Sequence, residues 1–179
     1  MNLALKITRV IDRCTDFAGW VAVICLIGAC LICSGNAIVR YSLNLSSNAF
    51  LEIQWYLFAG VVMFGAPQVF RLGEHIRVDI LYSKYSERTQ VLIDCFGIVF
   101  FLLPTMTLFF YLSFGIFINK LVSGEMSPNA GGLLRFPVWS TLPIGFALVS
   151  LQGFSELIKR LVFLRTGQCD FFQNVRNVQ

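Results

Sequence analysis

Few side chains in this 179-residue sequence are able to do chemistry, and Glu52 is the most informative of them. It lies inside an apolar segment, where ionisable residues are candidates for function by default. Tyr56 follows one helical turn later on the same face, so an ion-binding or proton-coupling role is one interpretation. Alternatively, Asn48 caps a helix and Glu52 lies near its positive end, where a carboxylate has a structural or partner-facing role.

The other reactive groups do not form the sets that enzymes need. His75 is the single histidine, which excludes a four-helix cytochrome with two axial histidines. None of the six cysteines falls in an expected outer loop, where oxidation would pair them, and a four-helix thiol oxidase needs such pairs. The spacing of metal ligands is also missing. We therefore expect no enzyme activity, no metal and no cofactor.

The composition predicts a chain that lies in a bilayer. Hydrophobic residues make up 56% of it and charged residues 13%, whereas soluble domains carry roughly 25% charged residues. A membrane span needs about 20 mostly apolar residues in helical form, and four segments meet this requirement, at residues 15–39, 49–70, 91–118 and 138–157. The fold class expected is an all-α membrane protein with one four-helix domain over residues 1–165 and a flexible tail over 166–179.

Two features refine this picture. Pro104 is expected to kink the third span, because proline removes a backbone donor. The Lys and Arg residues set the orientation: eleven fall in the two tails and the segment between spans two and three, and three fall on the opposite side. The positive-inside rule therefore predicts that both termini are cytoplasmic. The net charge of +4 then reflects topology, and no nucleic acid is needed to explain it.

The segment between spans two and three begins with charges of both signs, and its later part has apolar residues at helical spacing. The apolar members of this stretch are Val78, Leu81, Tyr82 and Tyr85. Basic residues lie on another face, which is typical of a short amphipathic helix on the cytoplasmic membrane surface. A second interpretation is a docking surface in which Arg77 and Asp79 bind another subunit.

Three local features resemble the small membrane subunit (DctQ type) of the tripartite ATP-independent periplasmic (TRAP) transporters. They are Glu52 with Gln54-Trp55-Tyr56, the loop Arg71-Leu72-Gly73-Glu74-His75-Ile76-Arg77-Val78-Asp79, and Ser127-Pro128-Asn129-Ala130-Gly131-Gly132-Leu133 followed by Arg135-Phe136-Pro137. The similarity covers about residues 10 to 162.

The resemblance implies a non-catalytic scaffold subunit in a bacterial inner membrane. Its partners are then the lipid bilayer, a large multi-span membrane subunit that uses a cation gradient, and a periplasmic solute-binding protein that delivers an organic anion such as a carboxylic or keto acid. The partner contacts expected are Glu52, Trp55, Tyr56, Arg71, His75, Arg77 and Asp79. The periplasmic docking loop is expected at Glu125, Ser127, Asn129 and Arg135.

Two other classes of function compete with the scaffold. The first is a self-sufficient small transporter that works as a homo-oligomer around Glu52, although this residue lies away from the midplane where such sites usually sit. The second is a membrane enzyme or electron-transfer anchor, against which the missing histidine pairs, outer cysteine pairs and metal clusters argue.

Overall fold

The structure is a computed structural model of the 179-residue chain, and it describes residues 2–44, 47–73, 85–129 and 132–166. Within these ranges, four helical segments are long and apolar enough to cross a bilayer. They are α1 (Asn2–Leu43), α2 (Asn48–Leu72), the continuous run of α4 (Glu87–Gly97), η1 (Ile98–Leu102) and α5 (Leu103–Ser123), and α6 (Phe136–Thr166). The predicted all-α fold with four membrane-spanning helices is confirmed.

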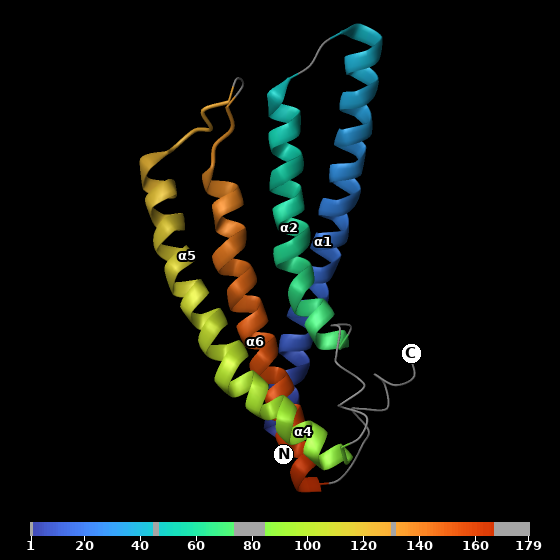
Figure 1. Ribbon diagram of the computed structural model, residues 1–179, viewed down its shortest axis with the longest axis vertical. Coiled ribbons are helices and arrows are strands. Elements are labelled where there is room, and N and C mark those ends of the chain that lie inside the picture. Colours follow the sequence, from blue (N-terminus) through green and yellow to red (C-terminus); the bar gives the residue numbers. More distant parts are fainter. Residues whose placement is uncertain (1, 45–46, 74–84, 130–131, 167–179) are drawn as a thin grey trace.

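The helices form two antiparallel hairpins, α1 with α2 and α5 with α6 (Figure 1). Both hairpin connections lie at one end of the molecule, which we call the loop end, with Asn44, Ser47 and residues 124–129 and 132–135. The start of α1, α4 and the end of α6 lie at the opposite end, which we call the terminal end (Figure 1). The two hairpin connections and the terminal end therefore lie at opposite ends of the bundle.

The helices are longer than the predicted spans. α1 begins at Asn2 and α6 continues to Thr166. The predicted spans include only the apolar runs, and charged residues extend both helices beyond these runs. The N-cap of α2 is Ser47, whose side chain accepts from the Ala49 amide at 3.3 Å. The expectation that Asn48 is the cap is thus wrong by one residue, since Asn48 is already helical. Gly73 ends the helix with φ 71°, the left-handed conformation that favours glycine.

Next to Pro104, where the sequence predicted a kink, the structure has a π-helical turn, η1, directly before α5. Pro104 lies in the first turn of α5, directly after η1 and inside the continuous helical run, where its missing backbone donor interrupts the regular hydrogen bonding. The wider π-helical turn accommodates the proline ring without ending the span. The third span therefore continues from Glu87 to Ser123.

The buried apolar residues come from α1, α4, η1 and α6. They are Ala18, Ala22, Val91, Ile98, Val149 and Phe163. Small residues let the helices approach closely: a Cβ on Gly145 of α6 would come within 2.8 Å of Met63 Cβ on α2. Most large apolar side chains on the outer faces are exposed, as lipid-facing surfaces require.

Candidate functional site

The polar side chains gather in two clusters, one at each end of the bundle. We call the first the terminal network; it consists of Asp12, Thr15, Asp16, Arg71, Asp94, Gln152, Ser155, Glu156, Lys159 and Arg160. We call the second the loop cluster; it consists of Glu52, Lys120, Glu125, Ser127, Asn129, Leu133 and Arg135.

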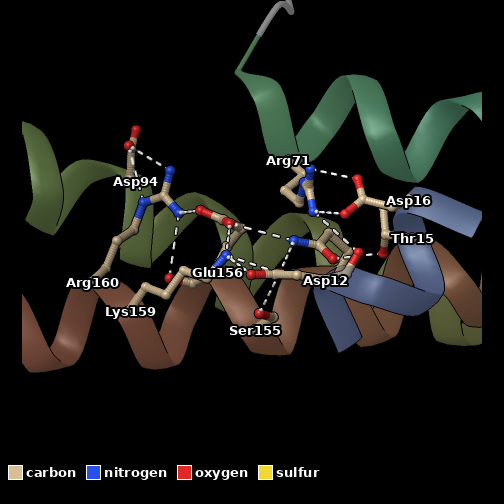
Figure 2. Close-up of polar contacts among 10 residues, drawn as sticks. Asp12, Thr15, Asp16, Arg71, Asp94, Ser155, Glu156, Lys159 and Arg160 are labelled. Atoms are coloured by element: carbon tan, nitrogen blue, oxygen red, sulfur yellow. Dashed lines mark hydrogen bonds and ion pairs between the residues drawn. The ribbon is translucent and has the colours of Figure 1, made fainter. Parts of the chain in front are cut away.

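At the centre of the terminal network, one carboxylate of α1 accepts three hydrogen bonds from α6 (Figure 2). Asp12 Oδ1 accepts from Lys159 Nζ at 2.9 Å, and from Ser155 Oγ and Gln152 Nε2 at 3.1 Å each. The amide of Gln152 also accepts from Thr15 Oγ1 at 2.7 Å. Gln152, Ser155 and Thr15 are fully buried, so these bonds join α1 to α6 away from solvent.

A second carboxylate, Glu156, extends the terminal network toward α4. It accepts from Lys159 Nζ at 2.9 Å and from Arg160 Nη1 at 2.7 Å. Arg160 also pairs with Asp94 of α4, with Nη2 and Oδ2 at 3.1 Å (Figure 2). The Lys159 and Arg160 side chains are only 9% and 7% exposed. Charges this deeply buried are tolerated because each has an opposite charge beside it.

Arg71 connects α2 to the same network. Its Nη1 donates to Asp16 Oδ2 at 2.8 Å and to the Asp12 carbonyl at 3.1 Å. The sequence predicted Arg71 as a partner contact, and the structure bonds it to two residues of its own chain, Asp12 and Asp16. With this residue the terminal network joins α1, α2, α4 and α6.

Sequence reasoning missed every other member of the terminal network, although a signal was present. On α6, Gln152, Ser155, Glu156 and Lys159 recur at helical spacing and so share one face. On α1, Asp12 and Asp16 are one turn apart. Lys159 and Arg160 were interpreted only as positive charges that set the orientation of the chain in the membrane. Their partners in α1 and α4 were therefore not predicted.

The loop cluster is built on a short antiparallel hairpin, which we call the loop hairpin and which comprises residues 125–129 and 132–135. Its two arms are held by a bond from the Ser127 amide to the Leu133 carbonyl at 2.9 Å and one from the Arg135 amide to the Glu125 carbonyl at 3.1 Å. Met126 and Leu134 form the bridge between them.

Ion pairs with Glu125 reinforce the loop hairpin. Glu125 accepts from Arg135 Nη1 at 2.7 Å and also pairs with Lys120 at the end of α5. The hydrogen bond from Lys120, followed by that from Arg135, lowers the pKa of Glu125. The same carboxylate raises the pKa of the Arg135 guanidinium. Both groups therefore stay charged at neutral pH.

Glu52 is buried and reaches the loop hairpin from α2. Its carboxylate accepts from Asn129 Nδ2 and from the Leu133 amide, at 3.3 Å each, and the Ser127 side chain also hydrogen-bonds to it. The sequence placed Glu52 and the docking loop in separate contacts. The structure brings Glu52, Glu125, Ser127, Asn129 and Arg135 into one cluster.

Of the remaining predicted site residues, Trp55 and Tyr56 are described, and neither is part of a cluster. Trp55 is 68% exposed on α2, and the Tyr56 hydroxyl is buried without a hydrogen bond within the described part of the chain. His75, Arg77 and Asp79 lie outside the described residues, as does most of the predicted amphipathic helix.

A comparison with protein families decides what kind of protein carries these clusters. The family model for the DctQ component of tripartite ATP-independent periplasmic transporters matches residues 29–163. The chain belongs to this family. The resemblance seen in the sequence is thereby confirmed, and the chain is a component of a TRAP transporter. Comparisons with curated proteins and with solved structures found no match.

The matched region of this DctQ component contains the whole loop cluster and the α6 half of the terminal network. Asp12, Thr15 and Asp16 of α1 precede it. A groove of about 530 Å³ also lies in the matched region, between the ends of α2 and α6 and the run from α4 to α5. Its lining is mostly apolar, with Asp94 and Arg160 at one side. The described residues contain no group of three His, Cys, Asp or Glu that could hold a metal ion.

Proposed function

We propose that this DctQ component is the non-catalytic scaffold subunit of its transporter. In this proposal it works with a large multi-span membrane subunit and a periplasmic solute-binding protein in the inner membrane of a bacterium. The complex imports an organic anion, such as a carboxylic or keto acid, by symport with a cation gradient. In this proposal both termini lie in the cytoplasm, because most Lys and Arg residues of the sequence fall in the two tails and in the segment between the second and third spans.

The observation that supports a scaffold is the terminal network. A carrier that alternates between two openings must move one group of helices against another. Here α1 and α4 are each joined to α6 by a largely buried ion pair, Lys159–Asp12 and Arg160–Asp94, and α2 is added through the more exposed pair of Arg71 with Asp16. Separating α1 or α4 from α6 would leave an uncompensated charge in a poorly solvated place, at a cost of about 3–5 kcal/mol for each broken buried pair. A set of helices held in this way suits the stationary part of a transporter.

Glu52 weighs against the competing proposal of a self-sufficient small transporter. Such a carrier needs an ionisable group that is free to bind and release its ion. The Glu52 carboxylate lies one turn into α2 and already accepts hydrogen bonds from Asn129 and Leu133 of its own chain. Its place near the helix start, rather than at the middle of the span, is also unlike carrier sites.

Reconstitution tests this proposal. Proteoliposomes are prepared with the large subunit alone, with this chain alone, and with both, and an imposed sodium gradient drives uptake of a labelled organic anion from its solute-binding protein. We expect uptake only when both membrane subunits are present. Uptake by this chain alone would contradict the scaffold role and favour the small transporter. A large subunit that works equally well alone would also contradict it.

A further inference from the structure

We propose that Glu52 positions the loop hairpin so that Met126 and Leu134 form a docking contact for the transporter's periplasmic solute-binding protein. This inference rests on the proposed function, because it needs that protein as a partner. It assigns the docking contact to two apolar residues that the sequence did not suggest. Glu52 acts through the loop hairpin and does not touch the partner itself.

Met126 and Leu134 form a pair of apolar side chains that lipid does not readily cover. They lie opposite each other on the antiparallel bridge, which places their side chains on the same face. Met126 is 60% exposed and Leu134 46%. Most exposed apolar residues of this chain lie on membrane-spanning helices, but these two lie between the spans that end at Ser123 and begin at Phe136. An apolar pair displayed beyond the spans fits contact with a water-soluble protein.

The polar residues of the loop hairpin are already bound within the chain. Glu125 is paired with Lys120 and Arg135, while Ser127 and Asn129 bond to Glu52. The four charges of the loop cluster, two positive and two negative, therefore balance. A partner gains little from competing for them, whereas apolar anchors such as methionine are enriched in the centres of protein interfaces. The contact is thus assigned to Met126 and Leu134.

The buried Glu52 is placed to fix the orientation of the loop hairpin. It accepts from Asn129 on one arm and from the backbone of Leu133 on the other, so one carboxylate of α2 holds both arms. Without it, the loop hairpin is attached only to α5 and α6, from which it extends. The two arms of the loop hairpin also approach closely at Gly132, where a Cβ would lie 2.3 Å from the Ser127 carbonyl oxygen.

The docking contact is tested on the complex, purified through a tag on this chain and placed in nanodiscs. The affinity for the transporter's solute-binding protein is measured by biolayer interferometry. We expect the double variant Met126→Ser with Leu134→Ser to bind about tenfold more weakly or worse. Leu43→Ser is the matched control, since Leu43 is 63% exposed at the same end on α1, and we expect it to bind as the unchanged complex does. Equal affinity of the double variant and the unchanged complex would overturn the contact.

The positioning role of Glu52 is tested in the same complex by hydrogen exchange. We expect Glu52→Ala to speed exchange of the Ser127, Leu133 and Arg135 amides, to leave α6 unchanged and to weaken docking about tenfold. Glu52→Gln keeps one acceptor oxygen and should lie closer to the unchanged complex in both measurements. Weaker docking with unchanged exchange would overturn the positioning role, because Glu52 would then contact the partner directly.

Failure of the proposed function gives a different result. An unchanged complex that contains the large subunit but binds no solute-binding protein would overturn both the docking contact and its partner. A tagged chain that purifies without any large subunit would overturn the scaffold proposal itself. Normal assembly and docking, with no effect of either the double variant or Glu52→Ala, would overturn this inference alone.

Discussion

The two polar clusters use similar residues in different surroundings. In the terminal network, the Lys159 and Arg160 side chains are less than a tenth exposed, and their ion pairs join helices far apart in the sequence. In the loop cluster, Lys120 and Arg135 are 25% and 38% exposed, and both pair with Glu125 of the same connection. The first cluster joins helices of the bundle, and the second mainly shapes one connection.

This difference in exposure indicates that the terminal end determines the stability of the bundle and the loop end determines local shape. Removing one partner of a buried ion pair leaves a charge that neither water nor protein neutralises, which is costly. An exposed pair loses little when it is broken, because water takes the place of the partner. Changes at the terminal end should therefore unfold the bundle, whereas changes at the loop end should alter one hairpin.

The largest effect is expected from Lys159→Met. This change keeps most of the side-chain volume but leaves Asp12 and Glu156 without the cation between them. We expect the free energy of unfolding to fall by about 3–5 kcal/mol, measured by circular dichroism during titration of the detergent-solubilised protein with SDS. Arg165→Met is the control, because Arg165 is exposed in the last turn of α6. Equal stability of the two variants would mean that the terminal network does not hold the bundle.

A smaller effect is expected from Asp94→Asn. The variant removes the charge that joins α4 to Arg160, but Arg160 keeps its bond to Glu156. We expect a loss of about 1–3 kcal/mol, with faster hydrogen exchange concentrated in α4. Loss of protection spread evenly over all four helices would contradict this prediction, since it would mean that Asp94 supports the whole bundle.

At the loop end, Gly132→Ala should disturb local shape with little change in global stability. The added methyl group clashes with the Ser127 carbonyl, so the loop hairpin must open. We expect faster exchange of the Ser127 and Arg135 amides and a stability change within about 0.5 kcal/mol. Gly115→Ala in α5, where nothing lies near the added methyl group, should leave the loop hairpin intact. Unchanged exchange of these amides in Gly132→Ala would contradict the close approach of Gly132 to the Ser127 carbonyl.

The smallest effect concerns the acidity of Glu125. The bonds from Lys120 and Arg135 lower its pKa, so these interactions are complete above the pH at which a free glutamate titrates, about 4.3. They are lost only as the pH falls through the lower pKa of the folded state. Carbon-13 NMR of labelled glutamate should give a titration midpoint below the free value, and Lys120→Gln should raise it. A midpoint that Lys120→Gln leaves in place would show that this pair does not form.

The sequence predicted the four spans and the family well, because lipid selects long apolar runs that are easy to count. It also singled out Glu52 and most polar residues of the loop cluster, since glutamate inside a span and turn-forming residues between spans are unusual. The predicted spans are shorter than the helices that contain them, because charged residues extend α1 before its apolar run and α6 after its apolar run.

The terminal network was missed for a physical reason. Its bonds join Asp12 to residues of α6 more than a hundred positions away, and no local pattern fixes which helix faces meet. Glu52 and the loop hairpin were separated for the same reason, since their contact depends on how α2 packs beside the connection between α5 and α6. Spacing within one helix indicates which residues share a face, whereas the partner of that face is set by tertiary packing.

We propose that this DctQ component is a scaffold that works only beside a large membrane subunit. Native mass spectrometry of the complex, extracted in mild detergent from its own membranes through a tag on this chain, tests it most directly. We expect one complex with a fixed ratio of this chain to a large multi-span membrane protein. A homo-oligomer of this chain with no such companion would contradict it.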